Sequence, residues 1–112
     1  MAMERNQEEY VAILVTVSSE EEGLRIARDL VDAKLAACVN IISGLRSIYR
    51  WEGKICDEGE LLLLIKTRMP LFEQVEGKIR EIHSYEVPEI VAIPITRGSE
   101  AYLNWLREST LS

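Results

Sequence analysis

The sequence lacks several features that would place it in a familiar class of protein. No apolar run approaches the roughly 20 residues that a membrane-spanning helix needs, so membrane insertion is not expected. The first residues are polar and acidic and contain no apolar signal-peptide core, which favours a cytoplasmic location. Residues 1–9 are interpreted as a flexible tail and residues 10–112 as one domain, because this length suits a single hydrophobic core.

Basic character is also missing, because the formal net charge is −6 and the lysines and arginines are scattered. Proteins that bind nucleic acids usually carry a basic patch or stripe, so no nucleic-acid partner is expected. The two cysteines, Cys38 and Cys56, form no Cys-x-x-Cys motif, which removes the usual soft-metal and thioredoxin-like signatures. Cys38 is interpreted as a small buried hydrophobic residue, and Cys56, beside several carboxylates, as a poor nucleophile.

Catalytic groups are scarce in this chain. No Ser-His-Asp set is recognisable, and His83 is the single histidine, so a histidine-rich metal centre cannot be assembled within the chain. The segment Ser18–Glu22, which follows the first apolar run, has no glycine-rich, arginine-bearing cradle for an anion. We therefore expect no enzyme activity and no required cofactor.

Apolar periodicity predicts four strands and three helices in the order β-α-β-β-α-β-α. The predicted strands cover residues 11–17, 37–51 with an interruption near Gly44, a return strand that ends at Thr67, and 89–95. The predicted helices cover residues 19–35, about 70–83, and a short segment from Ser99. A tight turn at Glu52-Gly53 joins the two central strands. This order is an α+β, ferredoxin-like βαββαβ arrangement with an extra C-terminal helix.

Three of these strands are apolar at every position instead of alternating with polar residues. The continuous stretches are 11–15, 61–65 and 90–93. A sheet with one face in water should alternate, so this pattern predicts that both faces are buried. One chain has helices for one face, and a second copy of the chain is the simplest cover for the other. The alternative is that the terminal helix alone covers that face.

Five short motifs, in this order, carry a family resemblance. They are Leu35–Asn40 (LAACVN), Tyr49–Lys54 (YRWEGK), Ile65–Thr67 (IKT), His83–Glu89 (HSYEVPE) and Tyr102–Trp105 (YLNW). Together they resemble the CutA family of divalent-cation tolerance proteins from about residue 11 to residue 107. The resemblance implies a ferredoxin-like homotrimer, related in fold and assembly to PII-like signalling proteins, with a role in tolerance of copper and other divalent ions.

The resemblance also implies a candidate metal site. Copper-linked members of the family carry a cysteine in the first strand and a His-His pair after the second helix, and these positions read Val15 and Ile82-His83 here. His83, with Glu86 and Glu89 nearby, is thus the candidate ligand set for a divalent metal ion such as copper. The alternative is a helix C-terminal histidine that interacts with the helix dipole.

A second candidate site consists of Tyr49, Trp51, Lys66, Tyr85 and Glu89, which the resemblance places around a cleft between subunits. Aromatic walls, one cation and one carboxylate suit a small ligand, although the same residues could fill the interface themselves. Three functions follow. They are divalent-cation tolerance by metal binding or metal-linked signalling, a PII-like sensor of a small metabolite, and a ligand-free trimeric scaffold whose protein partner is unknown.

Overall fold

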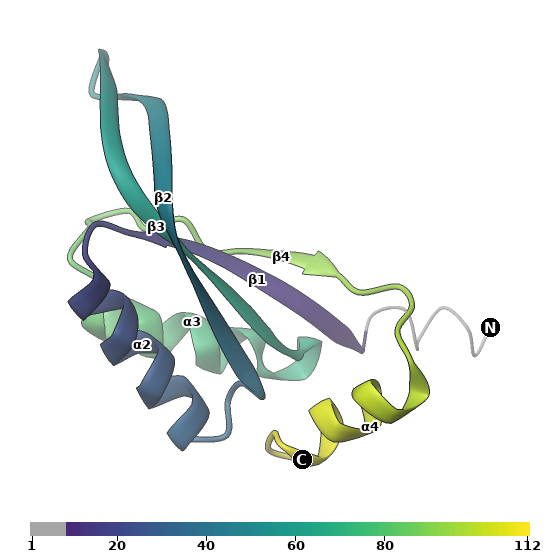
Figure 1. Cartoon of the computed structure of the whole chain (residues 1–112). Coiled ribbons are helices and arrows are strands. Elements are labelled where there is room, and N and C mark those ends of the chain that lie inside the picture. Colours follow the sequence, from purple (N-terminus) through teal and green to yellow (C-terminus); the bar gives the residue numbers. More distant parts are fainter. Residues whose placement is uncertain (1–8) are drawn as a thin grey trace.

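The computed structural model describes residues 9–112, which form a four-stranded antiparallel sheet in the order β2-β3-β1-β4 and three α-helices. The elements are β1 (Tyr10–Val17), α2 (Glu20–Asp32), β2 (Cys38–Trp51), β3 (Lys54–Arg68), the short 3₁₀ turn η1 (Met69–Leu71), α3 (Phe72–Ile82), β4 (Val91–Pro94) and α4 (Glu100–Glu108). Helices α2 and α3 lie against one face of the sheet, and α4 lies at its end (Figure 1). The predicted order of elements is confirmed.

The main core lies between the sheet and the two helices α2 and α3. Alternate residues of β1 and β3 point into it, because successive side chains of a strand face opposite sides of the sheet. Its fully buried members are Val11, Ile13, Val15 and Val17 of β1, Leu63 and Ile65 of β3, Ile26 and Leu30 of α2, and Val75 and Ile79 of α3. Val15, at the position where copper-linked relatives carry a cysteine, is therefore a core residue.

Helix α2 begins as predicted but ends earlier. The Ser19 hydroxyl accepts a hydrogen bond from the Glu22 backbone N–H at 3.2 Å, which caps the first turn. The helix ends at Asp32, because Lys34 adopts a φ of 59° and the Leu35 N–H donates to the Leu30 carbonyl at 2.9 Å. The predicted end at residue 35 was wrong, since Leu35 reaches the core from the connecting loop and extends the apolar pattern past the helix.

The β2–β3 hairpin extends well beyond the rest of the sheet (Figure 1). Only Leu61–Arg68 of β3 pairs with β1, whereas β2 pairs with β3 along almost its whole length. The register shifts between Ile42 and Leu45, where Gly44 has a φ of 86°, and this confirms the predicted interruption. Glu52 and Gly53 have φ values of 51° and 79°, as a two-residue type I′ hairpin turn requires.

The second half of the chain departs from the predicted bounds in two places. Pro70 lies in the turn η1, and α3 begins only at Phe72, so the predicted start near residue 70 was two residues early. Strand β4 is limited to Val91–Pro94 instead of residues 89–95, and Pro94 ends it at the sheet edge as predicted. Ser99 caps α4 by accepting from the Tyr102 N–H at 3.2 Å.

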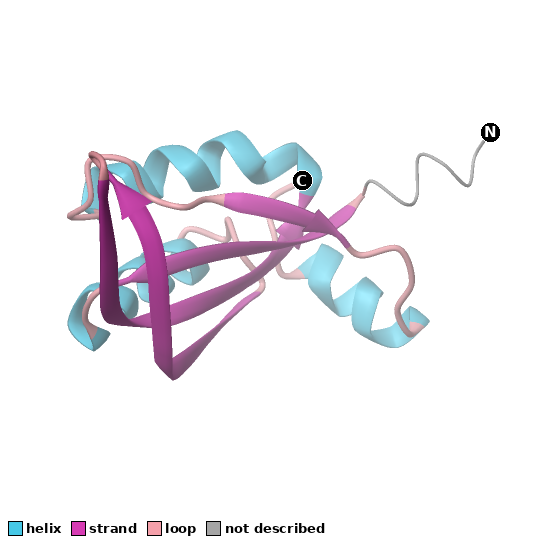
Figure 2. Ribbon diagram, turned by 90° about the horizontal axis from the view of Figure 1, so that it is seen from above, coloured by secondary structure: helices cyan, strands magenta, loops and turns pink. Residues whose placement is uncertain are grey.

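The opposite face of the sheet has almost no cover from this chain. Figure 2 shows α2 and α3 beyond the strands, with this face turned toward the viewer. Register places its apolar residues side by side, and we call them the uncovered face: Ala12, Leu14, Ile42, Leu62, Leu64, Val91 and Ile93. Ile42, Val91 and Ile93 are 45%, 47% and 50% exposed. Helix α4 covers only the end of the sheet, through Leu106 against Tyr10 and Ala37, so it does not bury this face alone.

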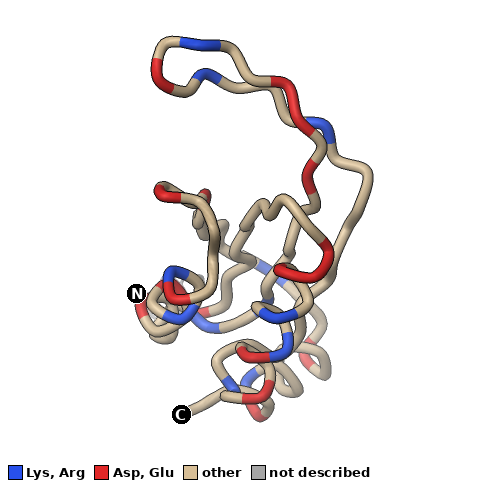
Figure 3. The backbone as a smooth tube through the Cα atoms, turned by 90° about the vertical axis from the view of Figure 1, so that its left-hand side faces the viewer, with Lys and Arg blue, Asp and Glu red and all other residues tan. Residues whose placement is uncertain are grey.

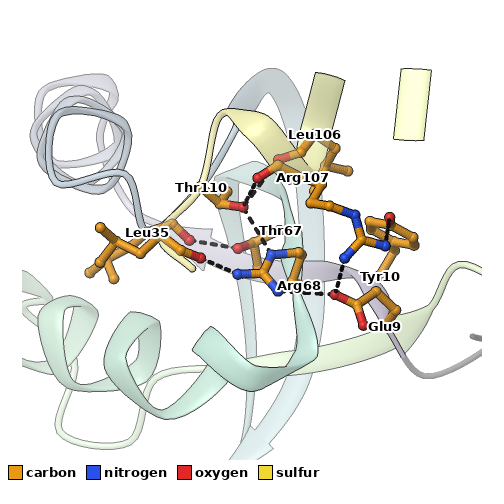
Figure 4. A network of polar contacts seen from close by, with 9 residues as sticks. Glu9, Tyr10, Leu35, Thr67, Arg68, Leu106, Arg107 and Thr110 are labelled. Carbon is orange, nitrogen blue, oxygen red and sulfur yellow. Dashed lines mark hydrogen bonds and ion pairs between the residues drawn. The ribbon is translucent and has the colours of Figure 1, made fainter. Parts of the chain in front are cut away.

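A polar network built on Arg68 joins the two ends of the described chain (Figure 4). The guanidinium of Arg68 donates to the Thr110 hydroxyl at 3.1 Å and to the Leu111 carbonyl, and it pairs with the Glu9 carboxylate at 3.0 Å. Arg107 pairs with the same carboxylate at 3.4 Å. Of the predicted tail, residues 1–8 lie outside the described residues, and Glu9 is held by these two ion pairs.

Replacing Arg68 with alanine should lower the free energy of unfolding by about 3 kcal/mol, because three polar groups lose a shared, buried donor. The matched control is Arg80→Ala on α3, whose ion pair with Glu76 is exposed, and there we expect a change of about 0.5 kcal/mol or less. Urea unfolding at one fixed protein concentration measures both. Equal losses in the two variants would contradict a stabilising role for the network.

Candidate functional site

A cleft of about 610 Å³ opens between the arm of the hairpin and the loop after α3. Strand β2 contributes Ser47, Ile48, Tyr49 and Trp51, and the loop contributes Tyr85, Glu86, Val87 and Glu89. The remaining lining residues, Thr16 and Glu60, are both buried. The cleft therefore has an aromatic and aliphatic wall from the hairpin and a partly acidic wall from the loop.

The cleft brings together most of the residues singled out in the sequence, with two exceptions. Tyr49, Trp51, Tyr85, Glu86 and Glu89 all line it. Lys66 does not, because it lies opposite Ala12 and Cys38 in the sheet and so belongs to the uncovered side. His83 is buried next to the cleft without lining it. The cation expected in the cleft is consequently absent from its lining in this part of the chain.

Glu60 is a functional candidate that the sequence patterns did not reveal. Its residue is only 7% exposed, and its Oε2 accepts a hydrogen bond from the Tyr85 hydroxyl at 2.6 Å. Burial, and then the bond to Glu60, raises the pKa of the Tyr85 phenol, so Tyr85 remains a donor over a wide pH range. The signal that could have found Glu60 is a carboxylate directly before the apolar run 61–65, opposite the strand irregularity at Leu45.

Tyr49 makes a similar bond on the exposed hairpin. Its hydroxyl donates to Oε1 of Glu58 at 2.9 Å. This hydrogen bond is the main cause that raises the pKa of Tyr49 to about 12, because ionising the phenol would remove the donor and place two negative charges together. Both cleft tyrosines are thus held in place by carboxylates of β3.

Both ring nitrogens of His83 make polar contacts with other groups of the protein. Its side chain is fully buried, with Nε2 lying 2.7 Å from the Thr16 carbonyl oxygen, so Nε2 carries a proton and donates it. Nδ1 accepts from the Tyr85 N–H at 3.1 Å and lies 3.2 Å from a Glu22 carboxylate oxygen. In this arrangement neither ring nitrogen has a lone pair free for a metal ion. Its position as the C-cap of α3 agrees with the alternative interpretation of a helix-terminal histidine.

The charge of the cleft has one sign. Its charged lining residues, Glu60, Glu86 and Glu89, are all acidic. Figure 3 shows further acidic segments along the arm of the hairpin above the body of the domain. Within residues 9–112, no three His, Cys, Asp or Glu side chains are grouped closely enough to hold a metal ion. The electrostatics favour cationic ligands, although a single chain does not supply a preformed metal centre.

Fold and site together define a small α+β protein with an acidic, aromatic-lined cleft. The sequence profile of the family described as CutA1 divalent ion tolerance protein matches residues 11–109. The chain belongs to this CutA1 family, which confirms the resemblance seen in its motifs. The family's description names tolerance of divalent ions and no reaction, and the expected absence of enzyme activity stays a prediction.

Similar proteins extend over nearly the whole described chain. The divalent-cation tolerance protein CutA of Thermus thermophilus is 52% identical over 98 residues, which cover 88% of this chain and 95% of that protein. A solved structure of the Thermus protein has a TM-score of 0.88 at 50% identity and covers 90% of this chain and 98% of its own. The fold described above is therefore that of solved CutA1 proteins.

Other relatives differ in length and in the location that their names give. The chloroplastic protein CutA of Arabidopsis thaliana is 48% identical over 89% of this chain, which spans only 55% of that protein. A structure titled as the periplasmic CutA of Archaeoglobus fulgidus has a TM-score of 0.87 at 43% identity and covers 89% of this chain and 97% of its own. The described residues contain no helix able to cross a membrane. The cytoplasmic location stays a prediction.

Spectrophotometric titration of phenolate should place the ionisation of Tyr49 at about pH 12, identified as the step lost in Tyr49→Phe. In Glu58→Gln the step should move down toward pH 10.0, the ordinary value. Because the folded-state pKa is raised, the bond contributes stability below about pH 10 that is lost as the pH rises toward 12. A wild-type step already near pH 10 would contradict the Tyr49–Glu58 bond.

Proposed function

We propose that this protein acts in divalent-cation tolerance as a homotrimer of ferredoxin-like subunits that bind divalent cations in the acidic cleft. The observation that supports the cation site is the lining of the cleft, whose three charged residues are all carboxylates, with no lysine or arginine from residues 9–112 to balance them. Relatives named for divalent-cation tolerance support the physiological role.

The carboxylates of the cleft, instead of His83, are the proposed ligands. Glu86 and Glu89 project from the exposed loop after α3, where they can adjust to an ion, and Glu60 lies deeper. Oxygen ligands suit hard divalent cations, and among first-row metals Cu²⁺ binds a given ligand set most tightly. Loosely arranged carboxylates imply modest affinity, which suits a protein that responds to an excess of metal more than one that stores it.

Calorimetric titration of the chelator-stripped protein with Cu²⁺ and Zn²⁺ tests this site. We expect dissociation constants of roughly 0.1–1 mM, weakened about tenfold or more in the double variant Glu86→Gln/Glu89→Gln. A matched control, Glu73→Gln/Glu108→Gln, removes two exposed carboxylates outside the cleft and should bind like the wild type.

A different pattern in the same titration would overturn the assignment. Binding that is lost in a folded His83→Ala variant but kept in Glu86→Gln/Glu89→Gln would make His83 the ligand. Binding that is equal in all variants would mean scattered carboxylates only, and the trimer would then act in tolerance through a partner or as a scaffold.

The uncovered face supports the trimeric assembly. Its seven apolar residues form one continuous surface across all four strands, and exposing such a patch to water is unfavourable. The strand order β2-β3-β1-β4 and the helices on one side support a ferredoxin-like arrangement, which leaves the second face of the sheet free for another subunit. The protruding hairpin offers a further contact, since Ile48 and Ile55 are each 68% exposed.

Replacing Ile93 with aspartate should break the assembly, because it would bury a carboxylate against apolar partners. Sedimentation equilibrium should give the wild type a mass three times that of the 12.8 kDa chain and give the variant the mass of one chain. The control Gln74→Asp adds the same charge to the exposed surface of α3 and should leave the trimer intact. A wild-type mass of twice the chain would exclude a trimer.

A small-molecule sensor is the second candidate function. The observation that favours it is the size and lining of the cleft, because a volume of about 610 Å³ with aromatic walls exceeds what a metal ion alone uses.

A further inference from the structure

We propose that the cleft binds an aliphatic polyamine, a flexible chain of methylene groups that carries two or more ammonium charges. This inference rests on the cation-binding cleft of the proposed function and adds an organic ligand to it. Three properties of the lining support it together: a carboxylate at depth, carboxylates at the entrance, and aromatic and aliphatic side chains that line the same cleft.

The deep carboxylate is Glu60, which is held in a fixed orientation. Its Oε2 accepts from the Tyr85 hydroxyl, while Oε1 has no hydrogen-bond partner among residues 9–112. No fully buried side-chain oxygen in that part of the chain lacks a partner, so Oε1 keeps some exposed surface, and Glu60 lines the cleft. An ammonium group has three hydrogen-bond donors and no acceptor, so it could donate a charge-assisted hydrogen bond to Oε1 of Glu60.

The outer carboxylates would pair with a second ammonium group of the ligand. Glu86 and Glu89 are exposed residues of the loop that forms one wall of the cleft. A ligand whose charges are separated by an alkyl chain can reach Glu60 and this rim at once, whereas a small ion can occupy only one of the two positions. The lining contains no lysine or arginine from the described residues that would repel such a ligand.

The apolar walls distinguish an organic cation from a metal ion. Trp51 is 42% exposed and Val87 is 64% exposed, so both have surface available for methylene groups. Tyr49 and Tyr85 are fixed by their bonds to Glu58 and Glu60, which orients their rings in advance. The faces of such rings attract ammonium groups, and Trp provides the strongest attraction. A hydrated metal ion gains nothing from these contacts.

Calorimetric titration of the full-length, assembled protein with spermidine at about 0.15 M salt tests the proposal. We expect saturable binding with a dissociation constant below about 1 mM. Trp51→Leu should weaken it about tenfold through loss of the cation–π contact, and Glu60→Gln should weaken it at least as much. The matched control is Trp105→Leu on α4, because Trp105 is 43% exposed, close to Trp51, and lies outside the cleft.

Mg²⁺ serves as the competitor, because it carries positive charge but has no methylene groups to contact the aromatic and aliphatic walls. Spermidine binding that survives a tenfold excess of Mg²⁺ and is weakened by Trp51→Leu but not by Trp105→Leu supports the inference. An absence of saturation, equal effects of the two tryptophan variants, or complete displacement by Mg²⁺ would overturn it. Cu²⁺ binding without spermidine binding overturns this inference alone, whereas spermidine binding without metal binding overturns only the metal site of the proposed function.

Discussion

The pairing of β3 with different strands along its length is the constraint on which the rest of the structure depends. From Leu61 onward β3 lies between β1 and β2 and is part of the sheet, while residues 54–60 pair with β2 alone and form the projecting arm. Glu60 stands at the change between the two environments, where the register with β2 also shifts. The cleft begins at this junction, with Glu60 in its lining, and extends along the arm of the hairpin to Trp51. The candidate site is thus a direct result of making one strand longer than its neighbour.

The order of the elements could be predicted from the sequence because each depends on local patterns: β-branched runs, Ser19 and Ser99 as helix caps, and Glu52-Gly53 as a turn. Element ends were less predictable. Leu35 continues the helical spacing of apolar residues although it lies in a loop, since a core accepts side chains from any backbone. Pro70 suits the first turn of either helix type, so it could not distinguish η1 from α3.

The content of the site depended on register and on tertiary contacts. Motifs brought Tyr49, Trp51 and Tyr85 into consideration, but which side of the sheet Lys66 occupies follows only from its pairing with Ala12 and Cys38. Glu60 belongs to no motif and matters because the loop carrying Tyr85 folds over it. The role of His83 also could not be predicted from its residue type. A single histidine suggests a metal ligand, but its contacts with Thr16, Tyr85 and Glu22 use both ring nitrogens.

The Arg68 network has a topological consequence. One guanidinium contacts both Glu9 and Leu111, so the first and last described segments of the chain meet at a single side chain. The first and last elements of the described chain therefore lie next to each other. The order of the strands in the sheet does not depend on where the chain begins and ends. A short linker between Glu9 and Leu111, with new termini opened at the hairpin turn, would preserve every strand pairing. The same closeness means that segments joined to the domain at Glu9 and at Leu111 would begin beside each other.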